Sequence, residues 1–311
     1  MNLVDRRRAG SPRPQRIKLG RLVLAASLVL LAGACTRTTM PLPGNQASPA
    51  PSGQPVEPTI VWATIEPRPG NLAVVWIDQG ETLPVRETAG IAGNEVAALA
   101  ATQHSLRPTG NTTALGSSQW VELTTPAGIV GWVPATSVTE AIPGDEFCND
   151  PNVVALLDEL RRVIAEEDAE GLRQLVSPKR DLILRLDFWN EEVRLPADQL
   201  AGIFEDVRSY QWGTRYASQT MIDGSFSQVI VPALWEVLAA DHQRACNQLL
   251  QGASPQPASW PVRYANLNYY SLLRQPSAGG NPFNWRTWVV AFEYVEGRPY
   301  LALLLQLRPQ V

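Results

Sequence analysis

The sequence is poor in the residues from which metal and nucleophilic active sites are built. Its 311 residues include two histidines and three cysteines. A zinc site needs three or four such ligands held together, and His104 and His242 are far apart in the chain. No G-x-S-x-G, P-loop or Rossmann glycine pattern is present. We therefore expect no metal, no cofactor, no catalytic residue and no enzymatic activity.

Charged residues are also scarce, at 18% of the chain, and they are unevenly distributed. Residues 1–34 contain seven arginines and lysines against a single acid, Asp5. The rest has 19 basic and 29 acidic residues, a net charge of about −10. Because phosphate backbones repel such a surface, the composition argues against nucleic-acid binding.

The sequence lacks a hydrophobic run long enough to span a membrane as a helix. The uncharged run at 22–34 has about thirteen residues, and roughly 20 are needed. It follows a basic segment and ends in Leu31-Ala32-Gly33-Ala34-Cys35, as an export signal does. This ending resembles the lipobox of bacterial lipoproteins, although Ala32 stands where leucine is commoner. The alternative is an ordinary secretory signal with an incidental cysteine.

The lipobox resemblance implies that Cys35 is lipid-modified and becomes the first mature residue. Residues 1–34 are then a signal peptide, and the acyl chains anchor the protein to the extracytoplasmic face of a cell membrane. Residues 35–58 are rich in Pro, Ser, Gly and Thr, which cannot bury a core. We predict that they form an extended, disordered tether.

Residues 59–143 contain short apolar segments separated by turns, which predicts a small all-β barrel or sandwich. We expect a Gly/Asn/Thr-rich loop near residues 108–111. Four segments resemble, in order, the motifs of the bacterial SH3-like family: Leu83-Pro84-Val85-Arg86-Glu87-Thr88-Ala89-Gly90, Val96-Ala97-Ala98-Leu99, Trp120-Val121-Glu122-Leu123 and Gly128-Ile129-Val130-Gly131-Trp132-Val133. The match covers a fifth of the chain and departs from the family at Pro84.

The SH3-like resemblance implies binding rather than chemistry. Domains of this family are attached to bacterial envelope proteins and are thought to contact peptidoglycan, peptides or other proteins. Trp76 and Trp120 are candidate ligand-binding aromatics, because amphipathic rings on a small barrel can line a groove. Arg86 could pair with a ligand carboxylate, although a structural salt bridge is the simpler interpretation.

Residues 144–311 predict an α+β domain with an antiparallel sheet. Asp150 and Pro151 begin a helix whose apolar residues recur at i, i+3, i+4 and i+7 up to Ile164. Further helices are expected at 172–176, 196–204 and 227–250, and strands at 183–189, 262–273, 285–295 and 300–307. This order is similar to the cone-shaped fold of nuclear-transport-factor-like proteins, in which a pocket is common.

Cys148 and Cys246 are the two cysteines other than Cys35, and an exported protein is expected to pair them. The bond would join the start of the first helix to the end of the long one. Two unpaired buried thiols are the alternative.

Two features of this domain could form a site. Asp187, Glu191 and Glu192 lie near Phe188 and Trp189, where an apolar setting could raise a carboxyl pKa. A solvated turn is the simpler interpretation. Trp285 and Trp288 have opposite parity on a predicted strand, so we expect one of them to face solvent as a candidate ligand-binding residue.

These observations favour a membrane-anchored lipoprotein that binds peptidoglycan, a peptide or an envelope protein through the SH3-like domain. One alternative is an envelope enzyme or small-ligand-binding protein that uses a pocket of the α+β domain, with Asp187 as its acid or base. Another is that this domain docks onto a protein complex.

Overall fold

A computed structural model of the protein describes residues 70–310. The predicted signal peptide, Cys35, the predicted tether and residues 59–69 lie outside the described residues. The described part has an α+β fold, mostly strands in several antiparallel sheets with a few helices.

The first region, up to residue 140, consists of short strands. They are β1 (Leu72–Val74), β2 (Thr82–Arg86), β3 (Glu95–Ala100), β4 (Arg107–Leu115), β5 (Ser118–Thr124), β6 (Val130–Pro134) and β7 (Val138–Glu140), with the 3-10 helix η1 (Ala135–Ser137). Five of them form an antiparallel sheet in the order β3-β2-β6-β5-β4, and β1 pairs with β7. Alternating residues of these strands, among them Leu83, Val85, Leu123 and Val133, form a small core.

The loop predicted near residues 108–111 is instead part of strand β4. Residues 107–115 pair with β5, and the register shifts between Pro108 and Thr112. Gly110 has a φ of 94° within this bulge, which suits glycine. The prediction was wrong because turn-forming residues inside a bulged strand have the same composition as a loop.

The second region contains the longer elements. They are α1 (Gly144–Cys148), α2 (Pro151–Glu166), α3 (Ala169–Leu175), β8 (Leu182–Leu186), β9 (Val193–Leu195), α4 (Ala197–Leu200), β10 (Tyr210–Thr214), β11 (Met221–Gly224), α5 (Phe226–Leu238), β12 (Gln243–Cys246), η2 (Val262–Tyr264), β13 (Asn268–Arg274), β14 (Arg286–Val295) and β15 (Arg298–Leu307). Strands β10 and β11 form a separate hairpin.

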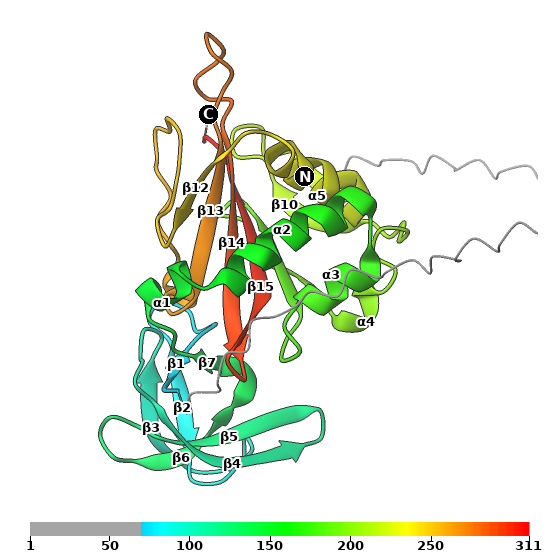
Figure 1. The fold of residues 1–311 in the computed structure, drawn as a ribbon. Helices are drawn as coiled ribbons and strands as arrows, with labels where there is room; N and C mark the ends of the chain where they lie inside the picture. Colours follow the sequence, from blue (N-terminus) through cyan, green and yellow to red (C-terminus); the bar gives the residue numbers. More distant parts are fainter. Residues whose placement is uncertain (1–69, 311) are drawn as a thin grey trace, which may run out of the picture. The chain divides into compact units, whose positions relative to one another are not determined.

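A six-stranded sheet in the order β12-β13-β14-β15-β8-β9 organises this region. All neighbours are antiparallel except β15 and β8, which run parallel. Helices α2, α3 and α5 cover one face, where the larger core lies (Figure 1). Residues of the β12–β13 connection, together with Val75 and Trp76, cover the other face. A sheet buried on both faces explains why its central strands are almost continuously apolar.

The beginning of helix α2 matches its prediction. The Asp150 carboxylate accepts a hydrogen bond of 2.8 Å from the backbone N–H of Asn152, and Pro151 occupies the first turn. The apolar positions from Val153 to Ile164 are buried against the sheet. Local capping and periodicity therefore decide this helix.

The helix predicted at 227–250 ends earlier, at Leu238. The following residues include the edge strand β12, which pairs with β13. The predicted disulfide between Cys148 and Cys246 is present. It joins the end of α1 to the end of β12, not to a long helix as expected. In the chain-entropy model, closing a loop of this length stabilises the fold by about 4–5 kcal/mol.

Candidate functional site

Both tryptophans of the predicted pair are buried. Trp288 lies in the core on the helical side of the sheet and Trp285 in the core on the opposite side. Their indole N–H groups donate to the carbonyls of Ala233 and Ala253, at 2.8 and 2.7 Å. Opposite parity does separate the rings, but the expectation that one faces solvent is not met, because both faces of the sheet are covered.

The candidate residues of the first region also have structural contacts. Trp120 is buried, and the Arg86 guanidinium donates to the carbonyl of Gly93 at 2.7 Å. Trp76 packs edge-on against Tyr264, with ring centroids 5.2 Å apart, and the Arg180 guanidinium lies 5.1 Å from its ring centroid. Neither these three side chains nor Trp285 and Trp288 line either of the two pockets described below.

Asp187 lies at the end of the large sheet where three strands bring charged residues together. It directly follows β8, and Arg308 directly follows β15. Because β8 and β15 are parallel, their carboxyl ends meet at the same edge. Strand β14 is antiparallel to β15, so its first residue, Arg286, comes to this edge too.

Asp187 is held in an unusual backbone conformation, with φ at 64°. Aspartate and asparagine tolerate this left-handed region better than most residues. Its backbone N–H still donates to the carbonyl of Gln306 at 2.8 Å, so the residue stays attached to β15 while the chain turns. The turn directs the segment toward the β10–β11 hairpin.

Asn190 fastens this segment to the hairpin. Its side-chain amide donates to the carbonyl of Thr214 at 3.1 Å and accepts from the Thr214 N–H at 2.9 Å. A side chain at Gly213, whose φ is 111°, would come within 2.2 Å of the Asn190 side chain. Gly213 is therefore needed for the close approach that places the hairpin tip beside Trp189.

A pocket of about 350 Å³ opens at this point. Three guanidinium groups, one carboxylate and three aromatic rings line it together with small residues. The lining residues are Asp187, Trp189, Arg215, Tyr216, Ala217, Ser218, Phe283, Arg286, Arg308 and Pro309. Trp189 and Tyr216 meet edge to face, with centroids 5.2 Å apart. The volume of the pocket is near the lower end of the range for small-molecule sites, about 300–1,000 Å³.

The Asp187 carboxylate is buried and only half paired. Its Oδ2 accepts from Nη2 and Nε of Arg308, at 2.7 and 3.2 Å. Its Oδ1 is buried and has no hydrogen-bond partner in the part of the chain that the structure describes. Burial raises the pKa of this carboxyl above its usual value, and the Arg308 guanidinium partly opposes that shift. Burial also lowers the pKa of Arg286.

The arginines of the pocket retain free donors. The Arg215 side chain is exposed and forms no hydrogen bond or ion pair with any residue in 70–310. Arg286 donates to the carbonyl of Trp285 at 2.7 Å and lies 4.0 Å from the Glu236 carboxylate. A guanidinium has five N–H groups, so the pocket has unused donors for an anion.

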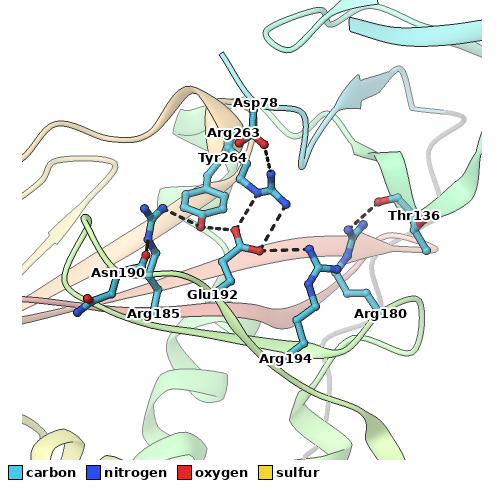
Figure 2. Close-up of polar contacts among 9 residues, drawn as sticks. All are labelled: Asp78, Thr136, Arg180, Arg185, Asn190, Glu192, Arg194, Arg263 and Tyr264. Carbon is cyan, nitrogen blue, oxygen red and sulfur yellow. Dashed lines mark hydrogen bonds and ion pairs between the residues drawn. The ribbon is translucent and has the colours of Figure 1, made fainter. Parts of the chain in front are cut away.

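A second polar cluster, which we call the Glu192 network, includes the end of the same β8–β9 connection (Figure 2). Glu192 accepts from the Tyr264 hydroxyl at 2.5 Å and pairs with Arg263 at 2.8 Å and Arg194 at 3.2 Å. Arg263 also pairs with Asp78 at 2.6 Å, on the side of the first region. Burial, followed by the Glu192 charge, raises the pKa of Tyr264.

The Glu192 network borders a pocket of about 420 Å³ that is lined by three acids and three arginines. Arg185 links it to the preceding turn, since it donates to the carbonyl of Asn190 at 2.7 Å and to the Tyr264 hydroxyl at 3.3 Å. Glu192 pairs with Arg194 and Arg263, and Arg263 also pairs with Asp78. We therefore interpret the Glu192 network as a structural joint, a set of ion pairs that holds the neighbouring segments together.

Comparison with protein-family models, curated proteins and solved structures finds no match for this chain. Within residues 70–310, no three His, Cys, Asp or Glu side chains are grouped to hold a metal ion. No helix of these residues has the length and hydrophobicity to cross a membrane.

The sequence favoured a solvated turn at Asp187, which is wrong because the sheet edge and Arg308 bury this residue. It also missed the arginines that surround Asp187. Arg286 and Arg308 are about one hundred or more residues away, and Arg215 lies on a hairpin that was not predicted. The available signal was that Arg286 lies at the beginning of the strand predicted at 285–295 and Arg308 directly follows the one predicted at 300–307, and side chains at strand ends often converge at a sheet edge.

Proposed function

We propose that this protein is an exported, lipid-anchored binding protein whose second region takes a small organic anion in the Asp187 pocket. The single observation that carries the proposal is the set of three guanidinium groups with free donors around one pocket that also has aromatic walls. Arginine binds planar carboxylates through two parallel hydrogen bonds, and the rings suit an apolar body.

The charge balance of the pocket supports an anionic ligand. Asp187 offsets one of the three arginines, which leaves two positive charges at neutral pH. The Glu192 network contrasts with this, since its three acids face three arginines. The Asp187 pocket therefore attracts an anion, whereas the pocket beside the Glu192 network does not.

The lipid anchor is proposed from the lipobox-like segment at Cys35. Radiolabelled palmitate should enter the protein and should not enter a Cys35→Ser variant. Fractionation of the protein with cytosol would contradict the anchor without touching the pocket.

The first region is a second candidate for binding, as an SH3-like domain. The four motif segments supply strands of one antiparallel sheet, which supports that interpretation. Apolar side chains exposed in this region, Ile91, Val96, Leu115, Ile129 and Val130, favour contact with a partner. Purified peptidoglycan should retain the protein at low salt, and absence of retention would count against wall binding.

The pocket is tested by calorimetric titration of the full chain in detergent with 3-phenylpropanoate, an aromatic carboxylate. We expect binding that weakens at least about fivefold in Arg215→Gln, because one charge-assisted contact is lost. Arg107→Gln, an exposed arginine on β4, is the matched control and should bind as the wild type does. Equal affinity in all three proteins, or no binding, rejects the proposal. If Asp187 serves as a catalytic acid or base instead, the bound compound will be converted rather than recovered.

A further inference from the structure

We infer that the ligand of the Asp187 pocket is a free aromatic amino acid, with an ammonium group beside its carboxylate. The inference rests on the proposed function and adds the chemical class of the ligand. It rests on the half-paired Asp187 carboxylate, which lies in the same pocket as the three arginines.

The unpaired Oδ1 of Asp187 calls for a hydrogen-bond donor. A buried carboxylate oxygen without a partner is costly, and natural structures rarely leave one. Arg308 satisfies Oδ2 and leaves Oδ1 unpaired. A ligand with only an anionic group would add repulsion here, whereas an ammonium group would satisfy the oxygen and its charge together.

The donor and the anion of the ligand must be close neighbours. Arg308 is bonded to the Asp187 carboxylate at 2.7 Å, so its remaining N–H groups lie within a few ångströms of that carboxylate. A ligand that reaches both needs its ammonium and carboxylate groups on one carbon or on adjacent carbons. An α-amino acid has this arrangement.

The walls of the pocket select the rest of the ligand. Trp189 and Tyr216 form one edge-to-face pair, and Phe283 belongs to the same lining. Aromatic pairs gain stability beyond that expected from the area they bury. An aromatic side chain is therefore preferred over an aliphatic or charged one.

Access to Oδ1 requires the pocket wall to adjust, because this atom is buried. The exposed members of the lining include Arg215, whose side chain has no hydrogen bond or ion pair within residues 70–310 and can therefore rotate. Changes of side-chain rotamer on binding are common even where the backbone stays fixed. Binding of the ammonium group is thus coupled to a rotation at the hairpin tip.

A free amino acid differs from a peptide in having both charged groups on one carbon. A peptide offers only its amino terminus or its carboxyl terminus at any one residue. N-acetyl-L-phenylalanine, which retains the carboxylate alone, therefore represents the peptide terminus in the test.

Calorimetric titration of the full chain with four compounds tests the inference. L-Phenylalanine should bind at least about tenfold more tightly than 3-phenylpropanoate, 2-phenylethylamine or N-acetyl-L-phenylalanine, because only it satisfies both charges. Asp187→Asn should bring the affinities for phenylalanine and 3-phenylpropanoate together, because the carboxylate that pairs with the ammonium group and repels a lone anion is removed. Arg107→Gln is again the control, and a thermal melt checks the fold of each variant.

The outcomes separate the two proposals. If phenylalanine and 3-phenylpropanoate bind equally, the amino-acid inference is overturned while anion binding stands. If 2-phenylethylamine binds most tightly, or if no compound binds, both proposals fall. The wild-type series decides these cases by itself, even if Asp187→Asn does not fold.

Discussion

Asp187 and Glu192 stand five residues apart on the same connection, yet their surroundings are opposite in kind. Glu192 accepts from Tyr264, Arg263 and Arg194, and both of its oxygens are paired. Asp187 is more deeply buried and has a single partner for one oxygen, Arg308. The Glu192 carboxylate is therefore fully paired, whereas the Asp187 carboxylate is not.

The difference separates a structural role from a binding role. A carboxylate whose two oxygens are both paired stabilises one arrangement of the chain. A buried acceptor left unpaired lowers stability and persists where something else requires it, which is typical of functional sites. We therefore expect substitutions on the Glu192 side to change folding, and those on the Asp187 side to change binding.

The largest effect is expected from Glu192→Ala. It leaves the Tyr264 hydroxyl without its acceptor and Arg263 with Asp78 as its remaining acidic partner. Removing one partner of a buried pair costs about 3–5 kcal/mol. We expect a loss of about 3 kcal/mol in the free energy of unfolding, measured by urea denaturation.

Glu191→Ala is the control for this variant, because Glu191 is the exposed neighbour of Glu192. It should change the free energy by less than about 0.5 kcal/mol. Equal losses in the two variants would show that the Glu192 network is not a structural joint.

Asp187→Asn tests the role of the incompletely paired carboxylate. Asparagine tolerates the left-handed backbone. The variant loses the ion pair with Arg308 but no longer buries a charge, and these two effects oppose each other. At pH 7 we therefore expect the free energy of unfolding to change by no more than about 1 kcal/mol. Because burial raises the folded-state pKa of Asp187, the stability that this carboxyl contributes is greatest below its ordinary pKa of 3.8 and falls as the pH rises through the raised value.

As the pH rises from 4 to 7, the Asp187→Asn variant should therefore gain stability relative to the wild type. Denaturation of both proteins across this range measures the difference in their unfolding free energies. Acids with lowered pKa values, such as Glu170 and Asp206, are common to both proteins and cancel in the difference. A difference that is flat across this range would contradict a raised pKa.

The smallest effect is expected from Asp78→Asn, at the rim of the Glu192 network. Its side chain is 63% exposed, and exposed ion pairs contribute at most about 1 kcal/mol. Urea denaturation should show a loss below about 0.5 kcal/mol that disappears at high salt. A loss as large as that of Glu192→Ala would mean that the network depends on its link to the first region.

Local signals in the sequence were sufficient for several elements. The helix from Pro151 was predicted by its cap and its apolar period, and the strands near Leu83, Val96 and Trp120 by alternation and turn residues. The pairing of Cys148 with Cys246 followed from the number of cysteines left. Strand β4 and the end of α5 were missed, because the residues there have ambiguous local preferences that pairing with a neighbouring strand overrides.

By itself the sequence determined the α+β class, the best helix and the disulfide, whereas it favoured a solvated turn at Asp187, which is buried. Only the tertiary structure decided that β8 runs parallel to β15, which gathers Asp187, Arg286 and Arg308 at one edge. Helix caps and apolar periodicity depend on residues close together in the sequence, so they can be predicted from it. The partners of a buried charge are chosen by strand order and register, which depend on contacts across more than a hundred residues.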